Sequence, residues 1–292
     1  MKNRVLRANA VRIALTGAAS TSILIVALIF VFLFREAIPF LRDPGVSALL
    51  DRQWVPVTFQ QSQYGLLPLI TGSLMVTVLA TLIAIPFGVI AAVYIAEVAY
   101  AYEREILKPF IELLAGIPSV VLGFFGLVVV APFVREAFDL RSGLNAFTGA
   151  LILALMAIPT IISISEDAIR AVPVSYKEAS MALGASRLQT VWRITVPSAL
   201  SGIIAAVMLG MGRVIGETMA VLMVTGNAAN LTANPFESVR TMTATIASEM
   251  GEVAYGSVHY RALFWVGVVL LVATFLINLA AQRVLRRYQE HE

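Results

Sequence analysis

The sequence predicts an all-α polytopic membrane protein with six transmembrane helices. Hydrophobic residues make up 59% of the 292 residues and charged residues only 13%, whereas soluble domains carry about 25% charged residues. The mean hydropathy is +0.86, and six apolar runs approach the roughly 20 residues that a helix needs to cross the bilayer. Lys and Arg gather at the ends of these runs, which is a charge pattern typical of membrane topology.

The six apolar runs define the predicted spans in chain order. They cover residues 14–34, 67–96, 112–134, 146–164, 199–225 and 262–281. No small-residue cleavage site followed by a polar mature chain comes after the first run, so we expect it to remain as an anchor rather than act as a signal peptide. Residues 1–66 then form a tail, the anchor and an outer segment, residues 67–285 a core, and residues 286–292 a C-terminal tail.

The positive charges favour an orientation with both termini in the cytoplasm. In that orientation the inner residues are Lys2, Arg4, Arg7, Arg12, Arg104, Lys108, Arg170, Lys177, Arg187, Arg193, Arg283, Arg286 and Arg287. The outer residues are Arg35, Arg42, Arg52, Arg135, Arg141, Arg240 and Arg261. An inner excess of this kind is the usual rule for membrane proteins. It leaves segments 35–66, 135–145 and 226–261 outside, and a polar loop, 165–197, inside.

The first half of this polar loop has the pattern of a short helix. We expect the helix over about 175–183, with Ser175 and Glu178 as a capping box at its start. Gly184 follows as the residue that most readily ends a helix in the left-handed conformation. The loop is therefore too patterned to be an unstructured linker.

The second half of the polar loop predicts another helix. Ser186 can cap it, the helix runs to about Ile194, and Pro197 breaks it where the next span begins. Its apolar stripe consists of Leu188, Val191 and Trp192. The two halves together predict a compact pair of helices that projects from the membrane.

The outer segment 226–261 holds a second amphipathic pattern. Apolar residues recur at helical spacing, namely Val239, Met242, Ile246 and Met250. Ser238 can cap a helix that runs to about residue 250, and Asn234-Pro235 supplies the turn before it. Two interpretations stay open: the helix seals the exit of a cavity or receives a partner, or it packs as a passive lid.

Two charged residues lie inside the fifth apolar run. A charge near the bilayer centre costs about 2.5–3.5 kcal/mol on insertion scales, and Arg213 and Glu217 are four residues apart, so they can pair on one helical face. We expect Arg213, Glu217 and Thr218 to line a path for an anionic substrate. A structural salt bridge that holds the helices together is the alternative.

Helix-breaking residues also occur within the predicted spans. They are Pro86, Gly116 with Pro118, and Pro159. Each frees backbone groups that neighbours must satisfy or that line a cavity. Such kinks suit helices that rock between two arrangements, and static kinks are the alternative.

The composition argues against several other functions. The chain has no cysteine and only two histidines, His259 and His291, so we expect neither a metal centre nor a histidine-based catalytic site. The phosphate-binding pattern Gly-x-x-x-x-Gly-Lys-Ser/Thr is missing, so the chain is not expected to hydrolyse ATP. Basic residues at span ends do not form a nucleic-acid patch, and we expect no cofactor.

Several segments resemble a known family. Glu178-Ala179, then Gly184, Ile194 and Pro197, are spaced as in the coupling motif of ABC importer permeases. The departures are Ser180, where alanine is usual, and Val196, where leucine is common. Further segments resemble the PstC-type permeases of bacterial high-affinity phosphate ABC importers, and these are residues 35–41, 64–74, 112–121 and 212–218.

The resemblance implies a fold, partners and a mechanism. It implies the type I ABC-importer permease fold, with a second, PstA-type permease subunit, two ATPase subunits and an extracytoplasmic phosphate-binding protein in the bacterial inner membrane. ATP would drive alternating access for inorganic phosphate. The residues that would contact the ATPase are Glu178, Ala179, Ser180, Gly184, Ile194 and Pro197.

Two alternatives to a phosphate permease stay open. The first is a permease for another oxyanion, such as sulfate or molybdate, which an intramembrane arginine would suit equally well. The second is an ATP-independent secondary carrier. Such carriers usually show inverted repeats, which the sequence does not display, and they would not need the helix pair.

Overall fold

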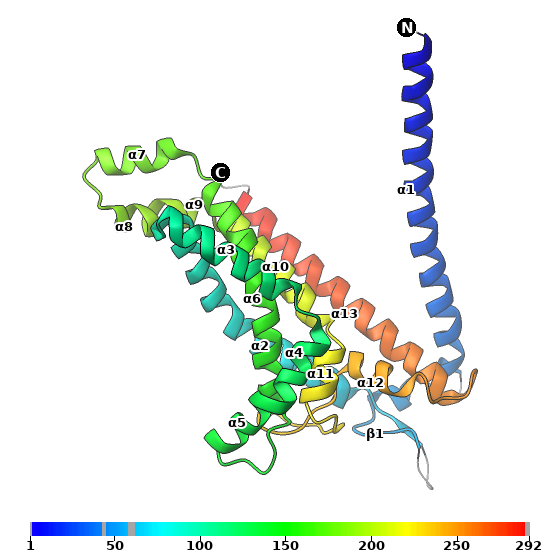
Figure 1. Cartoon of the computed structure of the whole chain (residues 1–292). Helices are drawn as coiled ribbons and strands as arrows, with labels where there is room; N and C mark the ends of the chain where they lie inside the picture. The colour runs from blue at the N-terminus through cyan, green and yellow to red at the C-terminus, as the bar shows by residue number, and fades with distance from the viewer. Residues whose placement is uncertain (1, 43–44, 58–61, 290–292) are drawn as a thin grey trace.

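The computed structural model describes residues 2–42, 45–57 and 62–289, which form an elongated bundle of helices (Figure 1). Within these residues, five helices are long and apolar enough to cross a membrane, and a sixth span results when one bent helix pair is counted as a single span. The prediction of six spans is therefore confirmed. Four of these five spans are each built on one long helix, namely α1 (Lys2–Ala37), α2 (Leu67–Val93), α6 (Ala146–Arg170) and α13 (Val258–Gln289). The other span, Ser119–Ala137, joins α4 (Ser119–Phe125) to α5 (Ala131–Ala137) through a π-helical turn, and the bent pair ends in α10 (Leu200–Ile215).

Shorter helices connect these spans. They are α3 (Ala101–Gly116), α7 (Val174–Ala182), α8 (Arg187–Thr190), α9 (Val196–Ser198), α11 (Met219–Val224) and α12 (Met242–Glu249). Three π-helical turns continue α2, α4 and α8, namely η3 (Tyr94–Val98), η4 (Gly126–Val130) and η5 (Val191–Thr195).

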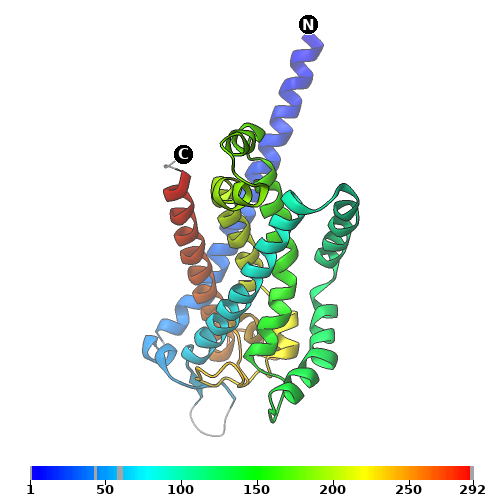
Figure 2. The same ribbon diagram turned by 90° about the vertical axis from the view of Figure 1, so that its left-hand side faces the viewer.

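The bundle has two distinct ends. The start of α1, the end of α13 and the pair α7–α8 lie at one end, which we call the coupling end (Figures 1 and 2). The opposite end, which we call the loop end, holds α5, α12 and a small antiparallel hairpin of β1 (Trp54–Val55) and β2 (Gln63–Tyr64). Two 3₁₀ turns, η1 (Ile38–Leu41) and η2 (Val46–Leu50), precede the hairpin. These two-residue strands were not predicted from the sequence.

Helices α2 and α6 form the centre of the bundle. Glycines permit this close packing, because a Cβ added at Gly88 of α2 would lie 2.7 Å from the Ile161 side chain of α6. On the other side of the same side chain, a Cβ added at Gly210 of α10 would lie 2.8 Å away. Ile161 is only 1% exposed, so the three spans are fixed around it, since packed interiors tolerate little added volume.

Helix α1 differs from the other spans because it stands away from the bundle (Figure 1). None of its most apolar 18-residue window is buried. It meets α13 near its own C-terminal end, where Phe32 and Phe264 pack edge to face with ring centroids 5.5 Å apart. Its apolar surface is therefore left for lipid or for another subunit.

Three of the predicted span boundaries were wrong. The third span begins at Ser119, because the backbone leaves the helical conformation at Ile117 and Pro118, so residues 112–116 belong to the separate helix α3. The fourth span continues past residue 164 to Arg170. The fifth predicted span breaks after Ile215 into α10 and α11, since Gly216 and the two polar residues after it do not continue the helix.

Candidate functional site

The coupling end carries the helix pair that the sequence predicted. Helix α7 ends in a Schellman motif, in which Gly184 donates to the Met181 carbonyl (2.9 Å) and Ala185 donates to the Ser180 carbonyl (3.2 Å). Gly184 has φ +88°, which is the left-handed conformation that glycine adopts without steric cost. The predicted turn at Gly184 is therefore confirmed.

One of the two helix caps predicted for the pair is confirmed, and the other is not. The Ser186 hydroxyl accepts from the Gln189 N–H (3.3 Å), and the Gln189 side chain accepts from the Ser186 N–H (2.9 Å), so the cap at Ser186 is confirmed. The capping box at Ser175 and Glu178 was wrong. Helix α7 starts at Val174 with Pro173 at the N-cap and without a side-chain cap, so Ser175 lies inside the helix and not at the position that caps it.

Two polar contacts tie the pair to the second span. The Lys177 ammonium on α7 bonds the Glu97 carboxylate at 2.5 Å, and the Arg187 guanidinium on α8 donates to the Glu97 carbonyl at 2.6 Å. Between the two helices, the hydroxyls of Ser180 and Thr190 lie 2.9 Å apart. The pair is thus one rigid unit attached to η3 at the end of α2.

The pair continues directly into the fifth span through a bend. The stretch Arg187–Ser198 and the helix Leu200–Ile215 meet at 67°. We expected the second helix to end near Ile194, and this was wrong, because Pro197 stands at the first turn of α9, where proline is tolerated. Any displacement of the pair therefore acts on α10 through Ala199.

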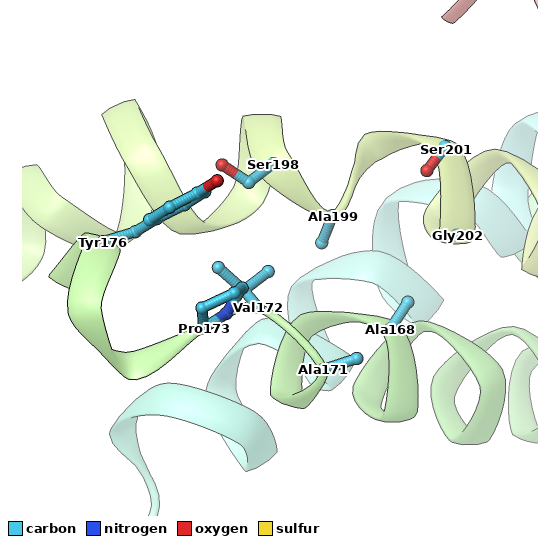
Figure 3. A pocket seen from close by; sticks show the side chains of 9 residues that line it. All are labelled: Ala168, Ala171, Val172, Pro173, Tyr176, Ser198, Ala199, Ser201 and Gly202. Carbon is cyan, nitrogen blue, oxygen red and sulfur yellow. The ribbon is translucent and has the colours of Figure 1, made fainter. Parts of the chain in front are cut away.

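A cavity of about 490 Å³ lies beside this bend. Figure 3 shows it between the end of α6, the start of α7 and the chain around Ser198 to Gly202. Most of its walls are small side chains, and the larger Tyr176 side chain points toward Ser198. The cavity therefore separates the end of α6 from the bend that leads into α10.

The outer face of the pair exposes apolar side chains. Leu183 is 91% exposed, and Met181, Leu188 and Trp192 are also exposed. Of the predicted motif residues, Glu178, Ala179, Gly184 and Pro197 are exposed, while Ser180 and Ile194 are half-buried. Clustered apolar exposure beside charged residues indicates a surface that binds another protein.

The second candidate site is the break in the fifth span. Arg213 lies in the last turn of α10, and its guanidinium donates to the Ala115 carbonyl at the end of α3 (3.4 Å). The Glu217 carboxylate accepts from the Ala220 N–H (3.1 Å) at the start of α11, where a negative charge suits the helix dipole. The Thr218 hydroxyl donates to the Gly216 carbonyl (3.3 Å).

The expected pairing of Arg213 with Glu217 was wrong for this conformation. In the part of the chain that the structure describes, no ion pair joins these two residues. The four-residue spacing brings side chains together only on a continuous helix, and the helix stops at Ile215. The two charges still stand on either side of one break.

A second break lies next to the first. Helix α3 ends at Gly116, and α4 starts at Ser119 after Pro118. The Arg213–Ala115 hydrogen bond spans the two breaks, and beyond them α4 and α11 pack so closely that a Cβ at Gly123 would lie 2.9 Å from the Ala220 Cα. Pro86 and Pro159, by contrast, sit inside continuous helices. Irregular backbone at membrane depth is tolerated where it is buried in protein or lines a water-filled cavity.

The described residues contain no group of three or more His, Cys, Asp or Glu side chains that could hold a metal ion. The geometry instead defines a class of protein, a membrane permease subunit. It combines a membrane bundle, two adjacent broken helices and a projecting helix pair with an exposed apolar face.

Comparisons with known proteins agree with this class. The model of the family described as "Binding-protein-dependent transport system inner membrane component" matches residues 84–290. The chain is 41% identical to the probable ABC transporter permease protein YqgH of Bacillus subtilis, over 92% of this chain and 87% of the relative. It is 35% identical to the phosphate transport system permease protein PstC of Mesorhizobium japonicum, over 94% of this chain and 89% of that protein.

Solved structures share the fold at low sequence identity. A bacterial alginate ABC transporter in complex with a pentasaccharide-bound periplasmic protein has a TM-score of 0.66 at 18% identity, covering 94% of this chain and 95% of that chain. The MetNI methionine transporter in an inward-facing conformation has a TM-score of 0.57 at 21% identity, covering 77% and 94%. The chain therefore belongs to the family of binding-protein-dependent transport inner-membrane components, and within it to the PstC-type permeases. The resemblance found in the sequence is confirmed.

Proposed function

We propose that the chain is the transmembrane permease subunit of an ATP-driven importer that passes inorganic phosphate from a binding protein into the cell. The observation that carries this proposal is an exposed helix pair in a chain that is 35% identical to a phosphate transport system permease over 94% of its length. The subunit itself is non-catalytic, and a separate subunit hydrolyses ATP.

The exposed surfaces of the chain support the proposed protein partners. The coupling pair offers Leu183 and its exposed neighbours to an ATPase subunit. The exposed length of α1 and the exposed glycines at the breaks, Gly116 and Gly216, offer surface to a second permease subunit of PstA type. A complete importer then holds two permeases and two ATPase subunits, with a phosphate-binding protein outside.

In the proposed orientation, the coupling end faces the cytoplasm and the chain lies in a bacterial inner membrane. Arg170, Lys177, Arg187 and Arg193 all lie in or beside the coupling pair. This matches the excess of positive charge that cytoplasmic loops carry. Both termini are then cytoplasmic, because the start of α1 and the end of α13 lie at the same end as the pair (Figure 1).

The motif residues form the proposed ATPase contact. They are Glu178, Ala179, Ser180, Gly184, Ile194 and Pro197. Closure of the ATPase subunits on ATP would displace the pair as a unit, because Glu97 and the Ser180–Thr190 contact hold it together. The bend at Ala199 passes that displacement to α10 and to the break at its far end.

Arg213, Glu217 and Thr218 form the proposed substrate path. A guanidinium has five N–H donors in a fixed plane, and in the described structure Arg213 directs one of them to the Ala115 carbonyl at a long 3.4 Å. The remaining donors suit a phosphate oxyanion. The Glu217 carboxylate on the other side of the break discourages tight retention of an anion.

Co-purification and an ATPase assay test this function. The chain, expressed with its neighbouring transporter subunits, should retain an ATPase subunit, and phosphate-loaded binding protein should stimulate hydrolysis. Sulfate- and molybdate-loaded preparations serve as controls for the other oxyanions. Failure to retain any ATPase subunit, or stimulation by sulfate or molybdate alone, would overturn the proposal.

Replacing Arg213 tests the substrate path separately. Arg213→Gln keeps a polar side chain and removes the guanidinium and its charge, so phosphate uptake should fall by about tenfold or more, as when one charge-assisted contact is lost. Arg283→Gln, at an exposed position towards the end of α13, is the control for charge loss. Unchanged uptake with Arg213→Gln would leave the residue a purely structural role.

A further inference from the structure

The short helix α12 connects two functional parts of the loop end. It lies between α11 and the start of α13 (Figure 1). Its first residues contact the second and fifth spans, and its last residue contacts the outer hairpin and the start of the sixth span. The predicted cap at Ser238 was wrong, because Thr241 caps the helix by accepting from the Ala244 N–H (3.3 Å).

At its first end, α12 holds the break in the fifth span. The Thr243 hydroxyl donates to the Glu217 carbonyl at 2.8 Å, and the Met242 N–H donates to the Ser73 hydroxyl of α2 at 2.9 Å. Because α10 has already ended, the Glu217 carbonyl has lost the helical partner that it would have in a continuous span. Thr243 supplies that partner and fixes where Glu217 stands.

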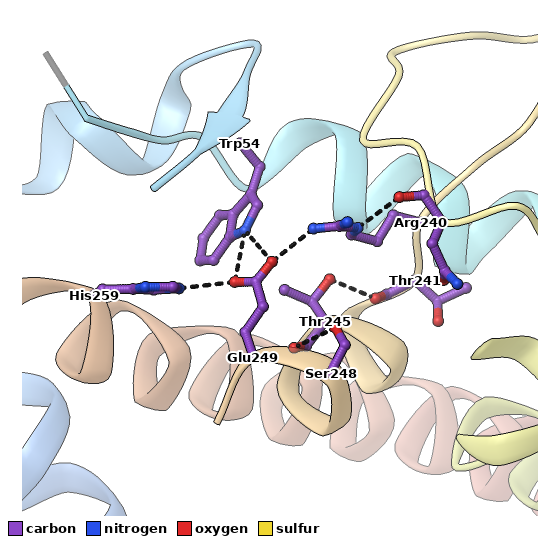
Figure 4. Close-up of polar contacts among 8 residues, drawn as sticks. Trp54, Arg240, Thr241, Thr245, Ser248, Glu249 and His259 are labelled. Atoms are coloured by element: carbon purple, nitrogen blue, oxygen red, sulfur yellow. Dashed lines mark hydrogen bonds and ion pairs between the residues drawn. The ribbon is translucent and has the colours of Figure 1, made fainter. Parts of the chain in front are cut away.

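At its other end, α12 is fixed by the carboxylate of Glu249 (Figure 4). This carboxylate accepts from the Arg240 guanidinium (2.6 Å), from the Trp54 indole N–H (3.1 Å to each oxygen) and contacts the His259 ring nitrogen (2.8 Å). Trp54 is 4% exposed. Charge-assisted hydrogen bonds of this kind are short and directional, so they tie α12 to the hairpin and to α13.

Apolar packing holds the middle of α12, in addition to the hydrogen bonds at its two ends. Its apolar residues Met242 and Ile246 lie in one cluster with Leu263 and Val266 of α13 and with Leu69 of α2. A passive lid would need only this apolar face. The Thr243–Glu217 hydrogen bond adds a specific link from a loop-end helix to the backbone of the proposed substrate path.

We propose that α12 is a rigid link between the loop-end surface and the break in the fifth span, with Thr243 as the positioning residue. A binding protein that docks on the loop end and displaces Trp54 or the start of α13 moves Glu249, and Thr243 passes the movement to Glu217. The inference rests on the proposed function, since it needs a binding protein on the outer side. It makes α12 the counterpart of the coupling pair at the other end of the same span.

The test uses the complete importer and two substitutions of one residue. Thr243→Val keeps the shape and removes the donor, whereas Thr243→Ser keeps the hydroxyl. Stimulation of ATP hydrolysis by phosphate-loaded binding protein should fall about fivefold with Thr243→Val, as for one lost hydrogen bond, while hydrolysis without binding protein stays unchanged. Thr243→Ser should behave as the wild type.

The outcomes separate this inference from the proposed function. A wild-type complex that phosphate-loaded binding protein does not stimulate contradicts the proposed function whatever Thr243 does. A stimulated wild type with equal stimulation in Thr243→Val overturns the link alone. If Thr243→Val does not assemble, Glu249→Gln decides: reduced stimulation with unchanged basal hydrolysis supports the link, and full stimulation overturns it.

Discussion

The coupling pair and α12 are both short helical elements between longer spans, yet they are built in opposite ways. The pair leaves its apolar side chains exposed and is held through Glu97 and the bend at Ala199. Helix α12 buries its apolar face and fixes both ends with side-chain hydrogen bonds. The difference indicates that the pair presents a surface to a partner, whereas α12 is fixed to the bundle and to the break in the fifth span.

The largest expected effect follows from placing a charge on the exposed face of the pair. Leu183→Asp removes a side chain that a docked ATPase subunit would bury, which is worth about 1.5–3 kcal/mol, and it adds a charge that docking would desolvate. Retention of the ATPase subunit should fall at least tenfold in a pull-down. Leu50→Asp, at a 68% exposed leucine of the loop end, should leave retention unchanged; equal loss in both variants would count against a specific surface.

A smaller effect is expected from the turn of the coupling pair. Gly184 has φ +88° and open space around its Cα, so the strain of a side chain there is conformational. Gly184→Val puts a β-branched residue into the left-handed region, which costs about 1–2 kcal/mol or more, and phosphate uptake per ATP hydrolysed should fall several-fold. Gly184→Asn is the matched control, because asparagine tolerates that conformation. Equal coupling in the two variants would show that the turn geometry does not matter.

The smallest effect is expected from removing the hydrogen bond between Trp54 and Glu249 at the end of α12. Trp54→Phe keeps the aromatic packing and removes one donor to Glu249, so the free energy of unfolding should drop by about 1 kcal/mol. Thermal unfolding in detergent measures this as a lower Tm. Trp192→Phe, at an exposed tryptophan of the pair, should leave Tm unchanged. A larger drop in Tm with Trp192→Phe than with Trp54→Phe would contradict the contrast between the coupling pair and α12.

Features that depend on a residue and its near neighbours in the sequence were predicted correctly. Gly184 and Ser186 end and start their helices as the sequence indicated, because a left-handed stop and a hydroxyl cap depend on one residue and its near neighbours. The span count followed from the lengths of the apolar runs for the same reason.

Features set by distant contacts were missed. The i, i+4 pairing of Arg213 with Glu217 assumed a continuous helix, but the helix ends at Ile215 and the Glu217 carboxylate accepts from the Ala220 N–H instead. The Glu217 carbonyl accepts from the hydroxyl of Thr243, which is 26 residues away in the sequence. The cap at Ser238 failed because its hydroxyl donates to the Thr225 carbonyl instead (3.1 Å). One signal was available: the residue before a proline avoids the helical region, which places a helix boundary at Ile117.

The most direct test of the coupling pair uses the absence of cysteine from the chain. Leu183→Cys then provides the only thiol of this subunit for a maleimide, and Leu50→Cys provides a matched thiol at the loop end. Labelling is measured on the isolated permease subunits and on the complex with the ATPase. The ATPase should protect position 183 and leave position 50 reactive, whereas equal labelling of position 183 in both preparations would contradict the assignment of this surface.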